Sequence, residues 1–317
     1  MSTNKFDSEY SSRFRINKSV MYGLMVLPGV IWFFLMTYVP MAGLLLAFKR
    51  FHASTGGFFQ SFWESPWVGF KNFEYLFSSN AAWIITRNTL GYGLAFIVLG
   101  TVLSIAIAIG FNELLNKKFA KILQTLVFAP YFVTWVVIGY IIWSFLSFEY
   151  GSVNGILKWF GVAPIHWYQL PDVWIFVMIL ADLWWIVGYT SIIYLAAVVG
   201  ISRQLYEAAE IEGASKWQQI RYITIPGIKP IIVVMVLVGL GQIFVGNFGL
   251  FWFGPRNSGA ILSTTNVIPT YMYRMLMTTE NIGMSTATCF YQSIVGLIFV
   301  LVFNGMMRKF DNENAMF

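Results

Sequence analysis

The sequence predicts an all-α integral membrane protein. Its 317 residues are 58% hydrophobic but only 11% charged, whereas soluble domains carry about 25% charged residues. Six stretches reach the length of about 20 apolar residues that a transmembrane helix requires. They are uniformly apolar, unlike the short alternating strands of a membrane barrel. Because a helix satisfies its own backbone hydrogen bonds in lipid, we expect a helical bundle.

The six predicted spans carry no charge, except for Asp182 in the fourth. Pro28, Pro40 and Pro130 fall within spans and disfavour strands there. The first apolar run is about twice the length of a signal-peptide core and lacks a small-x-small cleavage site, so we expect a retained helix. The spans are predicted at 20–48, 89–112, 122–148, 173–201, 230–255 and 286–307, between polar tails at 1–19 and 308–317.

The distribution of Lys and Arg predicts the orientation of the chain. If the N-terminus lies inside, the inner tails and loops hold 13 of the 20 basic residues and the outer loops hold 7. Cytoplasmic loops carry an excess of basic residues, so both termini are predicted to be cytoplasmic. The outer loops contain three further candidates for short helices, at 69–77, 153–160 and 269–277.

Few residues offer chemistry of their own. The single cysteine, Cys289, excludes an internal disulfide and a cysteine metal cluster, and we expect no metal site. The chain has no HExxH, no GxSxG, no phosphate-binding glycine loop and no paired intramembrane carboxylates. These observations disfavour a membrane-embedded enzyme, and no catalytic residue is predicted. A secondary transporter or channel is the alternative, for which several intramembrane charges or an internal repeat would be expected.

The segment 203–229, between the fourth and fifth spans, is the most densely charged part of the chain. Its pattern predicts a short helix, a bend at Gly213 and a second helix over 214–222. Pro226 and Pro230 are expected to end that second helix before the fifth span begins.

The first helix of this segment has a small apolar face. Ser202 is the expected helix cap. Ala208 and Ala209 would allow a partner's backbone to approach closely, and Glu207 beside them can accept hydrogen bonds or pair with a basic residue. The pattern is compatible with docking to a soluble partner, but it does not by itself favour docking. An ordinary interfacial helix between two spans is the alternative.

This segment resembles the EAA loop of permease subunits of binding-protein-dependent ABC importers. The family pattern is EAA-x3-G-x9-I-x-L-P, matched here throughout except that Ile225 replaces the usual Leu. Gly69-Phe70-Lys71-Asn72-Phe73, Ala129-Pro130-Tyr131-Phe132 and Gly188-Tyr189 are similar to segments of the carbohydrate-uptake group. Within that group the chain is most similar to the LplB-like branch, which includes the larger permease subunit of alginate importers.

The resemblance implies a type I ABC importer permease fold with six transmembrane helices and a cytoplasmic coupling helix, in a bacterial cytoplasmic membrane. It also implies a second homologous permease subunit in a heterodimer, two cytoplasmic ATPase subunits and an extracytoplasmic solute-binding protein. ATP and Mg would be bound by the ATPase subunits, so no cofactor is expected in this chain. Coupling to the ATPase would fall to Glu207, Ala208, Ala209, Gly213, Ile223 and Pro226.

An importer of this kind would hold an oligosaccharide between aromatic faces and polar groups of its spans. Asp182 is the leading candidate because an intramembrane carboxylate is costly, although a helix–helix hydrogen bond explains it equally well. The resemblance favours a uronate oligomer such as alginate, but only Arg256 and Arg274 lie near the spans in question, so neutral and acidic sugars both stay open. The other candidates are Trp184, Trp185, Tyr189, Gln242, Asn247, Trp252, Tyr291 and Gln292.

Overall fold

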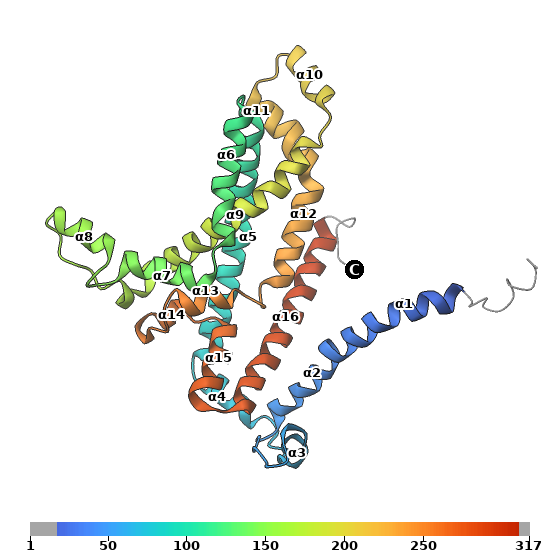
Figure 1. Cartoon of the computed structure of the whole chain (residues 1–317), viewed down its shortest axis with the longest axis vertical. Helices are drawn as coiled ribbons and strands as arrows, with labels where there is room; N and C mark the ends of the chain where they lie inside the picture. The colour runs from blue at the N-terminus through green and yellow to red at the C-terminus, as the bar shows by residue number, and fades with distance from the viewer. Residues whose placement is uncertain (1–17, 311–317) are drawn as a thin grey trace, which may run out of the picture.

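Long helices dominate the computed structural model, which describes residues 18–310 (Figure 1). Four of them, α5, α9, α12 and α16, run through the middle of the molecule. The short helices α10 and α11 lie at one end, here called the loop end, and α3, α4 and α15 lie at the opposite end. The long helices are α5 (Ala81–Glu113), α9 (Pro171–Val199), α12 (Ile225–Gln242) and α16 (Ile282–Phe310).

The described residues confirm an all-α protein with five helical stretches long and apolar enough to cross a membrane. A sixth arises if one sharply bent pair of helices counts as a span. The predicted tails at 1–19 and 308–317 fall almost wholly outside the described residues. The five stretches are Ser19–Phe48, Ala81–Glu113, Pro171–Val199, Lys216–Gln242 and Ile282–Gly305.

The third predicted span, 122–148, is wrong as a single helix. It consists of α6 (Lys117–Phe128), a short 3-10 turn and α7 (Trp135–Leu146), and the two halves differ in direction by 98°. Pro130 has no N–H for helical bonding, and Val133 and Thr134 then adopt extended ψ angles of 129° and 151°. The bend turns α7 away from α6, so that α7 lies across the bundle (Figure 1).

The fifth predicted span, 230–255, is wrong at both ends. The helix begins at Lys216, as α11 (Lys216–Gln219), continues through a π-helical turn into α12, and ends at Gln242. The chain then turns at Gly246, whose φ of 64° suits glycine, and the side chain of Asn247 caps α13 (Phe248–Phe253).

Pro226 does not end this helix, contrary to the sequence-based prediction, and neither does Pro230. The π turn at Ile220–Thr224 directly precedes Pro226 and shifts the local bonding, with the N–H of Ile225 donating to the carbonyl of Ile220. The wider turn accommodates the missing N–H and the ring of Pro226 without a break.

The first span stands apart from the rest of the described chain. It comprises α1 (Lys18–Phe33), a π turn, α2 (Val39–Met41) and a 3-10 segment that ends at Phe48. Only the 3-10 segment packs on the bundle, where the rings of Phe48 and Phe290 lie 5.3 Å apart. The side chains of α1 and α2 are exposed along their whole described length, and Figure 1 shows them projecting from the bundle.

Short helices cover the opposite end and one flank of the bundle. Three of them, α4, α8 and α15, coincide with the candidates at 69–77, 153–160 and 269–277. Asn72 of α4 is buried and its amide donates to the carbonyls of Ala47 and Lys49, which ties α4 to the end of the first span. The short helices are α3 (Phe58–Glu64), α4 (Lys71–Ser78), α8 (Ser152–Trp159), α14 (Leu262–Thr265) and α15 (Ile268–Thr279).

Helix α9 lies at the centre of the packing. The hydroxyls of Ser104 on α5 and Thr190 on α9 hydrogen-bond across that helix pair. On a neighbouring face, a Cβ at Gly188 would lie 1.9 Å from the carbonyl oxygen of Val127 on α6. The backbones of α6 and α9 therefore approach closely through glycine, as is usual for helices packed in membranes.

Gly188→Ala is expected to lower the free energy of unfolding by about 1–3 kcal/mol, because backbone atoms must move to admit the methyl group. The measurement is the thermal stability of the purified protein in detergent. Gly110→Ala is the matched control, since Gly110 is an exposed helical glycine with nothing within 4 Å of its Cβ position. Equal stability of the two variants would contradict the close approach.

Candidate functional site: the helical loop and the polar cavity

The loop between α9 and α12 consists of two helices joined at a sharp bend. Helix α10 (Arg203–Ile211) leads to Gly213, whose φ of 81° favours glycine. Ser215 then starts α11 with a reciprocal pair of hydrogen bonds to Gln218, a capping box. Ser202 occupies the N-cap position of α10, as predicted, but its side chain makes no capping hydrogen bond.

Two side-chain contacts hold α10 against the base of the loop. The ammonium of Lys216 lies 2.7 Å from Glu210 Oε1 and donates to Oε1 of Gln219 at 3.2 Å. The hydroxyls of Tyr206 and Thr224 lie 2.9 Å apart. The hydrogen bond with Lys216 lowers the pKa of Glu210, and the same contact raises the pKa of Lys216. These non-covalent contacts tie α10 to the base of the loop. We call the Lys216–Glu210 and Tyr206–Thr224 contacts the loop clasp.

The residues of the EAA pattern fall into two groups in space. Glu207, Ala208 and Gly213 are exposed on α10 and at the bend, and Ala209 is half-buried. The remaining two are at the base of the loop, in the π turn and the first turn of α12: Ile223 and Pro226. The tip of the loop therefore presents the first group, while the second shapes its connection to the long helix.

Large apolar side chains are also exposed around the loop tip. Ile211 is 89% exposed, Trp217 is 69% exposed and Leu205 is 54% exposed. Glu207 and Arg203 border a polar hollow between α10 and the loop-end termini of α5, α6 and α9. Figure 1 shows α10 at the extreme loop end of the molecule, where no other described element covers it. A projecting, mixed apolar and acidic surface of this kind fits a partner protein.

A cavity of about 320 Å³ lies between α5, α9, α12 and the turn before α13. Its walls are mostly apolar, and Asp182 is the one ionisable carboxyl that lines it. Asp182 is buried and accepts a hydrogen bond of 3.2 Å from the amide of Asn247. The carboxyl thus faces a cavity and also ties α9 to the segment before α13, and its role in binding substrate stays a prediction. Gln242 completes the polar lining near this pair.

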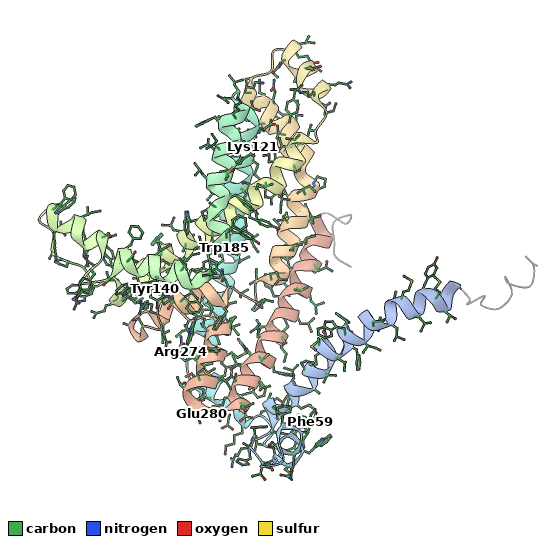
Figure 2. The ribbon with its side chains drawn as sticks, in the orientation of Figure 1. Phe59, Lys121, Tyr140, Trp185, Arg274 and Glu280 are labelled. Carbon is green, nitrogen blue, oxygen red and sulfur yellow. The ribbon has the colours of Figure 1, made fainter. Side chains whose placement is uncertain are left out.

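An aromatic cluster lies beside this cavity, at the bend between α6 and α7. The rings of Tyr131 and Tyr189 stack with centroids 4.4 Å apart and planes 9° apart. Trp185 packs on Tyr131 and on Trp135, and its indole N–H donates to the carbonyl of Val133 at 3.1 Å. Trp185 is three residues after Asp182 on α9, so the cluster and the cavity are neighbours. Figure 2 shows Trp185 near the middle of the molecule.

Sequence reasoning missed Tyr131 and Trp135 as site residues. The segment Ala129-Pro130-Tyr131-Phe132 carried a family resemblance, but its significance depends on the bend. Because Pro130 and the extended Val133 break the helix, Tyr131 and Trp135 both reach Trp185 on α9.

The predicted substrate residues do not gather at one place. Asp182, Gln242 and Asn247 line the cavity, and Tyr189 joins the aromatic cluster with Trp185. The others lie elsewhere. Trp184 is exposed on another face of α9, and Trp252 packs on Phe248 and Tyr273. Tyr291 of α16 hydrogen-bonds Thr86, and the neighbouring Gln292 has a buried Oε1. Their roles stay predictions.

Within residues 18–310, no three side chains of His, Cys, Asp or Glu are placed to hold a metal ion. The predicted lack of a cofactor in this chain stays a prediction. What the described residues offer is non-covalent: a projecting helical loop, a small polar cavity, and aromatic faces beside it.

Solved structures of bacterial alginate transporters share this architecture. One chain, from the crystal structure of an ABC transporter involved in the import of the acidic polysaccharide alginate, superimposes with a TM-score of 0.82 at 32% identity. The match covers 93% of this chain and 98% of the solved chain. A second, from the alginate transporter in complex with an alginate pentasaccharide-bound periplasmic protein, gives a TM-score of 0.81 at the same identity, with 93% and 96% coverage.

Curated relatives agree with the structural match. The polygalacturonan/rhamnogalacturonan transport system permease protein YteP of Bacillus subtilis (strain 168) is 32% identical over 296 residues, covering 92% of this chain and 88% of the relative. Protein LplB of the same strain is 28% identical, with 92% and 89% coverage. The model of the family "binding-protein-dependent transport system inner membrane component" matches residues 100–312. The chain therefore belongs to this family, the permease subunits of ABC importers.

Proposed function

We propose that this chain passes an oligosaccharide from a solute-binding protein into the cytoplasm and is coupled to ATPase subunits through the loop 203–229. The observation that carries the proposal is the projecting loop with its EAA pattern, joined without a break to a helix that lines the cavity. The chain itself has a non-catalytic role, and ATP and Mg bind to the partner ATPase subunits. Membership of the permease family displaces the alternatives of a secondary transporter and a membrane enzyme.

The loop tip is the proposed contact with the ATPase. The exposed Glu207 supplies a polar contact, and the small side chains of Ala208 and Ala209 permit close seating of α10 in a cleft. ATP binding would move the ATPase subunits together and α10 with them. Because the loop clasp fixes α10 to the base of the long helix, the displacement is passed to the bundle instead of being absorbed in the loop.

The loop end is proposed to face the cytoplasm, in line with the excess of basic residues on that side. Helix α16 begins at the opposite end, near α4, and runs toward the loop end, and α1 precedes a segment that reaches the opposite end (Figure 1). Both directions agree with cytoplasmic termini. The solute-binding protein would then meet the opposite end, with α3, α4 and α15.

The first span supports the presence of a second permease subunit. Its mean hydropathy is 2.0, yet only 11% of its most apolar 18-residue window is buried in this chain, and the side chains of α1 and α2 are exposed. A long apolar helix projecting from the bundle gains no packing from its own chain, and a homologous partner subunit would supply it. We propose a heterodimer with two ATPase subunits on the loop side.

The aromatic cluster and the cavity are the proposed sugar path. The C–H faces of a pyranose pack on aromatic rings, and hydroxyls need polar partners such as Asn247 and Gln242. Two proteins at 32% identity belong to transporters of polygalacturonan/rhamnogalacturonan and of alginate, which are polymers that contain uronic acids. We therefore propose an oligosaccharide, and specifically a uronate oligomer.

The test of coupling is reconstitution with the ATPase subunits and the solute-binding protein. Glu207→Lys and Gly213→Asp are expected to lower oligosaccharide uptake about tenfold or more while membrane insertion is retained, because each disturbs the docking surface. Uptake and co-purification of the ATPase are measured together. Glu149→Lys, the same charge change at an exposed residue of the connection between α7 and α8, is the control. Normal uptake by both loop variants would refute the coupling role.

The loop clasp generates a second prediction. Glu210→Gln or Lys216→Gln is expected to lower the uptake per ATP hydrolysed about two- to threefold, since α10 loses its tie to the base of the loop. The double variant Glu210→Lys with Lys216→Glu should recover the ratio. Because the pKa of Glu210 is lowered, the clasp is present above the ordinary carboxyl pKa and is lost as pH falls through the lowered value. No loss of coupling in either single variant would rule the clasp out.

A third prediction concerns the aromatic cluster. Tyr189→Ala is expected to raise the half-saturating concentration of the transported oligosaccharide about tenfold, because a stacking face worth about 1.4 kcal/mol is removed. Tyr189→Phe keeps the ring that stacks on Tyr131 and should stay close to wild type. Uptake kinetics in proteoliposomes give the values, and an equal effect of both substitutions would point to the hydroxyl instead of stacking.

A further inference from the structure

A groove of about 340 Å³ lies between α7 and α13. It shares no lining residue with the Asp182 cavity. It is formed where the two helices meet: a Cβ at Gly139 would come within 2.7 Å of the carbonyl oxygen of Phe253. Its side-chain walls include Tyr140, Trp252, Arg256 and Asn257. Figure 2 shows Tyr140 on α7, on the flank of the bundle.

Arg256 and Asn257 have an unusual backbone conformation. Their φ angles are 52° and 56°, so two consecutive residues other than glycine occupy the left-handed region. Asn tolerates this region but Arg seldom adopts it, and such strain concentrates at functional sites. Arg274 holds the turn in place, because its guanidinium donates to Oδ1 of Asn257 at 2.8 Å and to Oδ1 of Asn266 at 2.9 Å.

The turn directs the guanidinium of Arg256 over two aromatic rings. Its central carbon lies 5.1 Å from the ring centroid of Trp143 and 5.5 Å from that of Tyr140. Among residues 18–310, no side-chain or backbone oxygen accepts a hydrogen bond from Arg256, and no carboxylate pairs with it. The rings fix the plane of the guanidinium, while its N–H groups stay available to a ligand.

These groups match a sugar that carries a carboxylate. A guanidinium binds a carboxylate through two parallel hydrogen bonds, and the ring of Trp252, held by Phe248 and Tyr273, offers a face for a pyranose. The Asp182 cavity, by contrast, is lined by a carboxyl and by no Lys or Arg. An anionic sugar therefore finds its positive partner in the groove and not in the cavity.

We propose that the groove formed by Tyr140, Trp252, Arg256 and Asn257 is a subsite for a uronosyl residue of the transported oligosaccharide, with Arg256 binding the carboxylate. This inference rests on the proposed function and adds to it the site and the residue that would recognise the carboxylate of the substrate. Arg274 acts as a positioning residue, because it holds Asn257 and with it the strained turn.

The test uses the reconstituted importer with its solute-binding protein, with tetragalacturonate and the neutral maltotetraose as probes. Arg256→Gln is expected to raise the tetragalacturonate concentration for half-maximal ATP hydrolysis about tenfold or more. Arg256→Lys should give a half-maximal concentration between those of the wild type and Arg256→Gln, because an ammonium keeps the charge but cannot make the two parallel hydrogen bonds. Stimulation by the unloaded binding protein should be unchanged. Arg50→Gln, the same change at an exposed arginine outside the groove, is the control.

Several outcomes would overturn the subsite. If Arg256→Gln does not change the stimulation of ATP hydrolysis by tetragalacturonate, Arg256 contacts lipid headgroups instead of the sugar. If the variant changes the stimulation by unloaded binding protein, the turn takes part in docking that protein. If the Arg256→Gln variant loses the second permease subunit on purification, the turn belongs to the interface between the two permease subunits. Stimulation of the wild type by maltotetraose alone refutes the acidic class but retains the permease function. If no carbohydrate stimulates the wild type, the proposed function itself fails.

Discussion

One continuous helix, Lys216–Gln242, joins the projecting loop to the cavity, and the proposed function depends on it. A helix resists compression and bending because its backbone hydrogen bonds act together, so its two ends move as one body. Two prolines fall within this helix, and the π turn at Ile220–Thr224 accommodates the first of them within one continuous helical stretch. The loop clasp extends the rigid body to α10. Displacement of α10 would thus reach Gln242 at the cavity wall.

Two breaks in helical geometry, one between α6 and α7 and one after α12, create the places where a polar molecule could be held. The chain leaves helical geometry at Val133 and Thr134, and again around Gly246. At the first break the aromatic cluster assembles, and at the second Asn247 reaches Asp182. Irregular backbone at membrane depth is tolerated only where protein or water can satisfy it. The breaks and the cavity therefore have a common physical origin, as in other membrane transporters with interrupted helices.

The charges of the bundle are separated in a way that bears on the substrate. Asp182 faces the cavity between α5, α9 and α12, while Arg256 lies over Tyr140 and Trp143 beside the other groove. An anionic sugar would be drawn toward the arginine and repelled by an ionised carboxyl. Asp182 accepts a hydrogen bond from Asn247, and a neutral hydroxyl would be able to bind next to this pair. Under the proposed function, the two sites would bind different parts of one oligosaccharide.

The sequence by itself determined the fold class, four of the spans and the loop, because lipid requires long apolar helices and the EAA pattern is local in the chain. It could not determine that Pro130 bends the third span or that Pro226 leaves the fifth intact, since the same residue breaks or continues a helix according to the turn that precedes it. The sequence also could not determine which aromatic and amide side chains lie at the cavity or the aromatic cluster and which pack elsewhere. Tyr189 and Tyr291 look alike in an apolar run, and only the packing of α9 on α6 and of α16 on α5 places one in the aromatic cluster and the other on Thr86. The tertiary structure alone decides which face of a uniformly apolar helix is buried, because such a helix carries no polar face to mark it.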